Sequence, residues 1–221
     1  MVDEQPVTAR NRRFPVDRHQ GLSDGVFAIA MTLLVLDIKL PAGLSDDITN
    51  ARLTAELWQS VRPSFLTYLL SFFVIGSQWM AHHEMFHDIR LVDRRMGSYN
   101  LQYLLVIAVM PFPSSVLADH GDLPVAVALY AVAIGLGGLL RARMQSYAVN
   151  NDLLKPSVDV AAWRKDTRAA VFFGLLFVGS AGVAYVRYWF AYVLWVVVLG
   201  GWAVLSRSGV WGLLRDRFAR R

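Results

Sequence analysis

Apolar residues in this 221-residue chain fall into long blocks that short charged stretches separate. A helix needs roughly 20 apolar residues to cross a bilayer core about 30 Å thick, and several blocks reach that length. A soluble domain of this size has shorter apolar runs and more alternation. The pattern therefore predicts an all-α, polytopic membrane protein. Its six predicted transmembrane helices cover about Leu22–Leu40, Ser64–Ala81, Leu101–Leu117, Pro124–Leu140, Ala169–Val186 and Tyr188–Leu205.

Polar segments precede and follow this six-helix domain, which we place at residues 22–205. We expect an N-terminal tail over residues 1–21 and a basic C-terminal tail over residues 206–221. The last two helices are joined only by the region of Arg187, so they should form a tight hairpin. The longest polar loop is predicted around Gln145–Asp166, and no separate soluble domain is expected.

Basic residues are unequally divided between the two predicted membrane faces. Of the 22 lysines and arginines, 18 lie in the tails and in alternate connections, and the other four are Lys39, Arg52, Arg62 and Arg187. The positive-inside rule therefore predicts a multi-pass protein of the cell membrane with both termini in the cytoplasm. The net charge of +5 then reflects cytoplasmic loops and lipid headgroups, so membrane lipids are expected partners and nucleic acid is not. The absence of cysteine excludes a disulfide framework and a thiolate site.

The first helix carries the most distinctive run, from Arg18 to Ile38. Its Ser23-Asp24 pair could cap a helix, because these side-chain oxygens accept hydrogen bonds from free backbone N–H groups. A cap does not account for the run that follows, which includes Gly-Val-Phe-Ala-Ile-Ala. The run resembles the signature of the transmembrane protein 175 family of potassium channels, in which three residues separate an arginine from Phe-Ser-Asp. Arg18, Ser23 and Asp24 match this signature, and Leu22 stands in place of the phenylalanine.

Two further segments resemble the prokaryotic, single-repeat members of this family. They are Ile75–His83, at the end of the second helix, and the third helix from Asn100 to Pro111-Phe112-Pro113. The resemblance implies a six-helix subunit that assembles as a homotetramer, with the first helices around a central pore. The signature occurs once in the chain, and one helix cannot enclose a pore, so several chains must contribute.

Ile29, Leu33 and Leu36 lie on one helical face, and Thr32 shares it. Any apolar helix has such spacings, so a pore role follows from the resemblance, in which Ile29 matches the constricting isoleucine. The resemblance implies a potassium-permeable cation channel with passive conduction through this apolar constriction. A carbonyl filter is excluded, because the chain has no Thr-Val-Gly-Tyr-Gly stretch. Asp37 is interpreted either as an acidic ring at the outer mouth or as a simple interfacial carboxylate.

Ionisable side chains inside a membrane bundle are costly unless they are paired. Topology brings several polar residues of the first three helices to the same membrane face. The resemblance implies that they form a hydrogen-bonded cluster that packs the pore helix against its neighbours. This structural network is predicted to comprise Arg18, Ser23, Asp24, Trp79, His82 and Asn100.

A rival motif occurs at the end of the second helix. His83-Glu84-Met85-Phe86-His87 matches H-E-x-x-H, in which both histidines can bind zinc and the glutamate is the general base. A zinc protease needs a third protein ligand to the metal. In the sequence that follows the motif, only aspartates are candidates for this ligand. This membrane-embedded protease is one alternative. A secondary transporter is the other, although paired repeats and broken helices are not clear in the sequence. We expect no enzyme activity, no bound metal and no cofactor, with K⁺ as the permeant ion.

Overall fold

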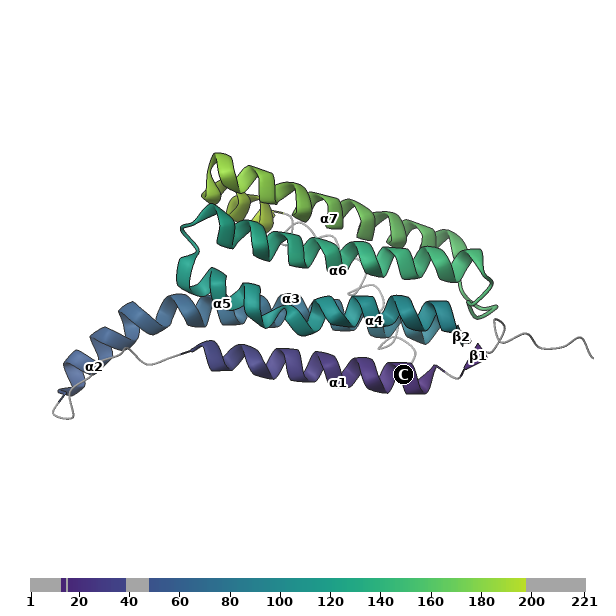
Figure 1. The fold of residues 1–221 in the computed structure, drawn as a ribbon, viewed down its shortest axis with the longest axis horizontal. Helices are drawn as coiled ribbons and strands as arrows, with labels where there is room; N and C mark the ends of the chain where they lie inside the picture. The colour runs from purple at the N-terminus through teal and green to yellow at the C-terminus, as the bar shows by residue number, and fades with distance from the viewer. Residues whose placement is uncertain (1–12, 15, 39–47, 198–221) are drawn as a thin grey trace, which may run out of the picture.

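The computed structural model describes residues 13–14, 16–38 and 48–197. These residues are nearly all helical, and Figure 1 shows the long helices running side by side. In chain order the helices are α1 (Asp17–Leu33), η2 (Leu34–Asp37), α2 (Asn50–Glu56), η3 (Leu57–Val61), α3 (Arg62–Asp88), α4 (Arg94–Val109), α5 (Pro111–His120), α6 (Pro124–Asn150) and α7 (Val160–Val186).

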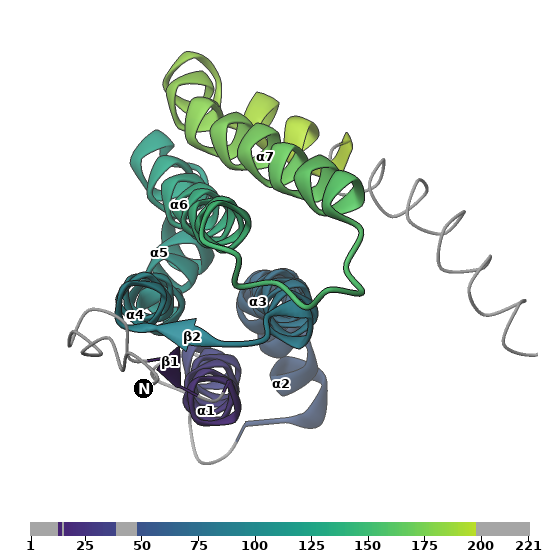
Figure 2. The same ribbon diagram turned by 90° about the vertical axis from the view of Figure 1, so that its right-hand side faces the viewer.

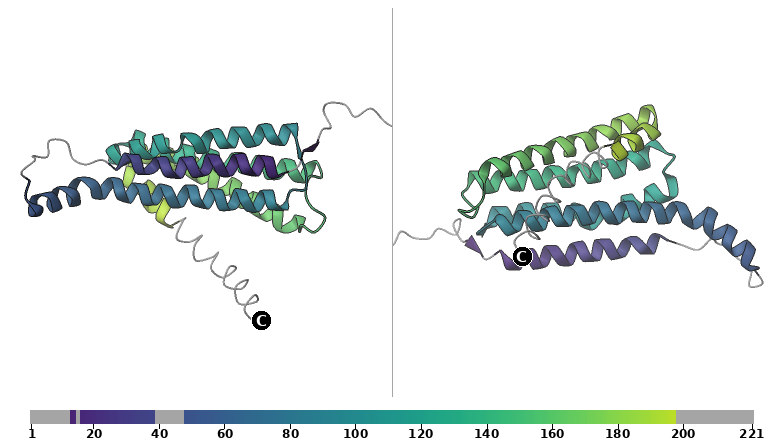
Figure 3. Two further views of the ribbon diagram at one scale, coloured as in Figure 1. Left: turned by 90° about the horizontal axis from the view of Figure 1, so that it is seen from below. Right: turned by 180° about the vertical axis from the view of Figure 1, so that it is seen from behind.

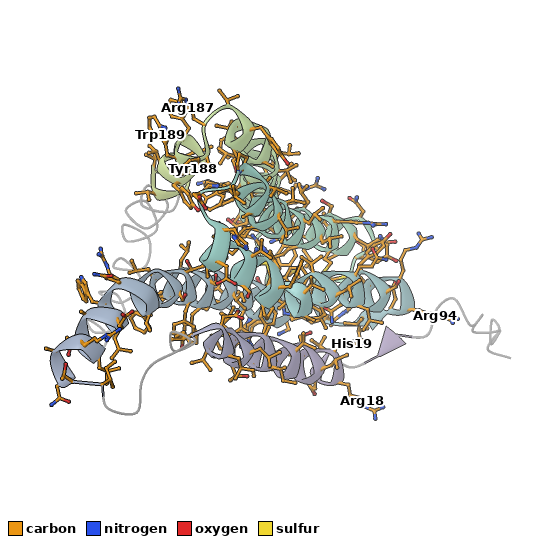
Figure 4. The ribbon with its side chains drawn as sticks, turned by 60° about the vertical axis from the view of Figure 1, so that its left-hand side comes forward. Arg18, His19, Arg94, Arg187, Tyr188 and Trp189 are labelled. Carbon is orange, nitrogen blue, oxygen red and sulfur yellow. The ribbon has the colours of Figure 1, made fainter. Side chains whose placement is uncertain are left out.

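Among the residues that the structure describes, five helical spans are long and apolar enough to cross a membrane. They are Asp17–Asp37, Ser64–Asp88, Arg94–His120, Pro124–Asn150 and Val160–Val186. A shorter apolar helix, Tyr188–Val197, follows Arg187 where the sixth span is predicted. The rest of that span, the predicted C-terminal tail and most of the N-terminal tail lie outside the described residues. Figure 4 shows Arg187 at the end of the bundle opposite Arg18 and Arg94, as a tight hairpin at this position requires.

The helices extend beyond the apolar runs that predicted them. The first helix begins at Asp17 rather than Leu22, α3 continues to Asp88, and α6 continues to Asn150. The predicted loop over Gln145–Asp166 is therefore wrong, because only residues 151–159 separate α6 from α7. Once a helix is nucleated, each added residue gains a backbone hydrogen bond, so polar helix-forming residues prolong it past the apolar segment.

Prolines mark two places where the spans depart from one regular helix. The third predicted helix is divided at Met110, and α5 begins at Pro111. Proline has no N–H and its ring clashes with the carbonyl four residues earlier, so it interrupts an α-helix. Pro63 stands in the first turn of α3, directly after the π-helical η3. There α2 bends away from the bundle, as Figures 1 and 3 show.

A short antiparallel pair, which the sequence did not predict, lies at one end of the bundle. The strands are β1 (Arg13–Phe14) and β2 (Val92–Asp93), with Arg13 opposite Asp93 and Phe14 opposite Val92. Backbone N–H and C=O groups outside helices need hydrogen-bond partners, and the pairing supplies them. It also ties the segment before α1 to the connection between α3 and α4.

Helix α1 lies at the edge of the bundle. Figure 2 looks along the helices and shows α3 and α4 on one side of α1, with α6 and α7 stacked beyond them. The buried core includes Phe27 of α1, Tyr103 of α4 and Tyr130 of α6. One side of α1 is thus fixed by packing within the protomer, and the other side is turned away from the remaining helices.

Candidate pore helix and its polar support

Helix α1 and η2 have two apolar faces with opposite environments. The face against the bundle consists of Phe27, Ala30 and Leu34, each 1% exposed. The outward face carries Ile29, Leu33 and Leu36, which are 61%, 42% and 66% exposed. The predicted stripe is therefore apolar and has no partner within the described part of the chain.

Thr32 and Asp37 add oxygen atoms to this segment. The hydroxyl of Thr32 is exposed and donates to the main-chain oxygen of Ile29 at 2.9 Å. The Thr32 oxygen still has a lone pair, which can face a cation. Asp37 is half-buried and is the last residue of η2, at the end of α1 opposite Arg18.

A continuous hydrogen-bond chain joins α1 to α3 through α4. His82 Nε2 lies 2.8 Å from Asn100 Oδ1, and Asn100 Nδ2 donates to Ser23 Oγ at 3.1 Å. Ser23 Oγ in turn donates to the main-chain oxygen of His19 at 2.8 Å. His82, Asn100 and Ser23 are all buried, so every polar group in this chain depends on its neighbour.

A second pairing links α1 to α3 nearer the surface. Trp79 Nε1 donates to Asp24 Oδ1 at 2.8 Å, and Gln20 Nε2 lies 2.8 Å from His83 Nδ1. Ser23 and Asp24 lie about two turns inside α1, which begins at Asp17. The alternative interpretation of this pair as a helix cap is therefore wrong.

Aromatic rings enclose His82 and complete the polar cluster. The imidazole stacks on the ring of Tyr103, with 5.2 Å between ring centroids and 3° between ring planes. It also stacks on the ring of Phe86, with 4.5 Å between centroids and 29° between planes. Tyr103 is buried, and its hydroxyl donates to the main-chain oxygen of Gln78 at 3.3 Å. Sequence reasoning missed Tyr103, although it lies one helical turn after Asn100 and so shares a face with it.

Arg18 is placed differently from the other predicted network residues. It is exposed in the first turn of α1, and Figure 4 shows it extending away from the bundle. Within the residues that the structure describes, its side chain makes no hydrogen bond or ion pair. The structure brings the other five network residues together in two adjacent groups and leaves Arg18 outside them.

The H-E-x-x-H motif lies on the last turns of α3. His83, Glu84 and His87 are exposed, and His87 Nδ1 lies 3.3 Å from Asp88 Oδ1. Over residues 16–38 and 48–197, no group of three His, Cys, Asp or Glu side chains is arranged to hold a metal ion. The described part of the chain therefore offers no third ligand to this histidine pair.

Comparison with known proteins identifies relatives of this chain. The family model for "Endosomal/lysosomal potassium channel TMEM175" matches residues 18–111. A protein of Streptomyces collinus named as a potassium channel is 36% identical over 155 residues, 66% of this chain and 71% of that protein. A potassium channel of Chamaesiphon minutus is 33% identical over 141 residues, 62% of this chain and 68% of that protein.

A solved structure has the same fold. It is described as a lysosomal potassium-selective channel TMEM175 homolog from Chamaesiphon minutus. The TM-score is 0.73 at 26% identity, and the match covers 86% of this chain and 97% of that one. Members of this family are ion channels and not enzymes. The resemblance predicted from the signature is confirmed, and this chain belongs to the TMEM175 family.

Proposed function

We propose that the chain is one subunit of a homotetrameric, potassium-permeable cation channel of the cell membrane. Each subunit contributes six transmembrane helices, with both termini in the cytoplasm. Four copies of α1 surround the pore, and conduction through it is passive. The relatives named as potassium channels support the permeant ion, and the positions of the basic residues support the orientation.

The exposed apolar face of α1 is the observation that carries this proposal. Ile29, Leu33 and Leu36 face away from a bundle that buries the opposite side of the same helix almost completely. A helix that faces only lipid on one side needs no small or hydroxylated residues there. This face includes Gly25 and Thr32, which are suited to close approach of helices and to ion contact.

The proposed filter works by dehydration. An ion that passes rings of Ile29, Leu33 and Leu36 must shed part of its water shell. Potassium holds water less tightly than sodium, so its barrier is lower. Thr32 oxygens would replace some of the lost water, and a tight apolar ring also allows gating by dewetting. Asp37 would form an acidic ring at the outer mouth that attracts cations, and no cofactor takes part.

The polar cluster would hold α1 in the position that sets the pore diameter. Ser23, Asp24, Trp79, His82 and Asn100 are assigned to this structural role, because their hydrogen bonds join α1 to α3 and α4 and point away from the apolar face. We assign Arg18 to the same supporting role between subunits, since its side chain extends beyond its own bundle.

Replacement of Ile29 by asparagine tests the constriction. Amide dipoles would stand where the ion now meets methyl groups, so the dehydration barrier should fall. Sodium should gain more than potassium, which raises conductance and weakens the potassium preference. The measurement is the reversal potential of the purified, reconstituted protein under potassium–sodium bi-ionic conditions. If the reversal potential depended on the gradient of a second, co-transported substrate, the protein would instead be a secondary transporter.

Two matched variants control this experiment. Leu105→Asn changes a residue of α4 that is 66% exposed, and it should leave the reversal potential unchanged. Leu34→Asn places an amide on the buried face of the pore helix segment, and it should lower the yield of folded protein without tuning selectivity. An unchanged reversal potential in well-folded Ile29→Asn channels would remove Ile29 from the filter.

A further inference from the structure

A cavity of about 380 Å³ lies between α3, α6 and α7, away from the exposed face of α1. Ligand sites in proteins commonly measure roughly 300–1,000 Å³. The cavity extends along the helices, which run parallel in Figure 1. The pore mechanism makes no use of it.

The two ends of this cavity differ in chemistry. Toward the middle of the bundle it is lined by the apolar residues Val74, Ile134 and Phe177. At the end near β1 and β2 it is lined by three carboxylates and one guanidinium. These are Glu84, Asp88, Asp166 and Arg141. A molecule that fits must therefore be amphipathic, with its polar part at the end of the bundle and its apolar part toward the middle.

Two buried polar atoms in the wall have no hydrogen-bond partner among the described residues. One is the donor Nε of Arg141, and the other is the acceptor Oε1 of Gln145. The two residues are four positions apart on α6, so their side chains lie on the same face, about one helical turn apart. Gln145 is only 4% exposed, and a buried polar group without a partner is costly.

Three other polar residues beside the cavity already have hydrogen-bond partners. Ser77 donates to the main-chain oxygen of Val74 at 2.8 Å, and Gln78 accepts from Tyr103. Trp163 donates its indole N–H to the main-chain oxygen of Gln145 at 3.0 Å. The two buried atoms without a partner therefore require an acceptor beside Arg141 Nε and a donor beside Gln145 Oε1, and the carboxylates of Glu84 and Asp166 line the same cavity.

We propose that this cavity binds a zwitterionic phospholipid with a primary ammonium headgroup, of the phosphatidylethanolamine type. Its phosphate accepts from Nε of Arg141. Its ammonium donates to Oε1 of Gln145 and to the neighbouring carboxylates. One acyl chain follows the apolar wall toward the middle of the bundle, so the headgroup lies at the membrane interface.

The same chemistry ranks other lipids lower. A phosphatidylcholine has no N–H on its ammonium and leaves Gln145 without a donor. An anionic phosphatidylglycerol has no ammonium to offset its phosphate, and its net negative charge meets three carboxylates against one guanidinium. Cytoplasmic pockets that bind anionic lipids are basic instead.

The experiment measures lipid retained by the full-length protein. The protein is reconstituted in vesicles with equal amounts of the three phospholipids, extracted in mild detergent, and analysed by native mass spectrometry. The ethanolamine lipid should be retained preferentially. The double variant Arg141→Met, Gln145→Leu should retain about tenfold less of it, because one charge-assisted hydrogen bond corresponds to roughly a decade of affinity.

Two further variants make the outcome decisive. Arg143→Met is the matched control, since Arg143 lies over the ring of Tyr99 at 4.1 Å and does not line the cavity. It should retain lipid like the unmodified protein. Asp166→Asn alters an exposed residue that folding tolerates, and it should shift retention toward phosphatidylglycerol even if the double variant fails to assemble.

Three results would overturn the proposal. They are retention of the three lipids in proportion to their supply, the same loss in Arg143→Met as in the double variant, and an unchanged preference in Asp166→Asn. Potassium flux is measured on the same preparations. A protein that keeps its lipid preference without conducting would refute the proposed channel and leave the lipid site standing.

Discussion

Asn100 uses both ends of its side-chain amide inside the bundle. Its Nδ2 donates to Ser23, so its Oδ1 faces His82, and Nε2 of His82 must carry the hydrogen of that bond. Each partner is buried, and neither has water as an alternative. At the scale of single residues, this one amide group therefore links the proposed pore helix to both α3 and α4.

Replacement of Asn100 by alanine should destabilise the protein. The change leaves the His82 donor and a Ser23 lone pair unpaired in the core, and each such group costs roughly 1–3 kcal/mol. With two such groups, the free energy of unfolding in detergent, measured by denaturant titration, should fall by about 2–6 kcal/mol. Asn150→Ala, at the exposed end of α6, is the control and should change it little. Equal stability in both variants would contradict the structural role of the cluster.

Asp24→Ala tests the same cluster at its outer pair. The indole N–H of Trp79 would lose its acceptor, which lies 2.8 Å away. We expect impaired assembly or folding, seen as a lower yield of the oligomer in size-exclusion chromatography. Normal oligomers with altered ion selectivity alone would instead mean that Asp24 contacts the ion.

Five residues of this cluster were predicted, but Tyr103, the separate position of Arg18 and the individual pairings were not. Hydropathy shows that His82 and Asn100 lie within or beside apolar spans, and such residues need partners. Which partner each one finds depends on helix rotation and on the ends of the helices, and the apolar runs fix neither. The first helix begins at Asp17 and not at Leu22, which moves Ser23 from a cap position into the interior.

At the scale of elements, α6 and α7 pack closely through glycines on both helices. A Cβ added to Gly135 would lie 2.6 Å from the main-chain oxygen of Gly174 and 2.9 Å from the main-chain nitrogen of Val178. The two backbones touch because neither glycine has a side chain. The spacing of these glycines was visible in the sequence, but which helix they face depends on the fold.

Gly135→Ala should therefore push α7 away from α6. Two of the three obstructing atoms belong to the backbone of the neighbouring helix, so a change of the Val178 rotamer cannot relieve the clash. Overpacking of this kind costs about 1–3 kcal/mol, and the thermal midpoint in detergent should fall accordingly. Gly179→Ala on α7 is the control, because its added methyl group meets nothing within 4 Å. Equal midpoints would show that the helices separate without cost.

At the scale of the whole molecule, the exposed apolar face of α1 has no partner in the described part of the chain. In our proposal four copies of this face meet on a common axis. Four chains of 24.8 kDa give about 99 kDa, which mass photometry or native mass spectrometry resolves from smaller assemblies. A stable monomer that conducts ions would refute the arrangement, because one α1 cannot enclose a pore.

Single cysteines test which face of the pore helix segment meets the other subunits. The chain has no cysteine of its own, so any cross-link must come from the introduced residue. Leu36→Cys places a thiol on the exposed face, where the proposed constriction brings neighbouring chains close enough for a disulfide, with Cα atoms less than about 7 Å apart. Oxidation should convert most of this variant to covalent dimers on a non-reducing gel. Leu34→Cys points into its own protomer and should remain monomeric on the same gel. Cross-linking of Leu34→Cys but not of Leu36→Cys would mean that the opposite face of this segment meets the other subunits, and that the proposed pore lining is rotated by about half a turn.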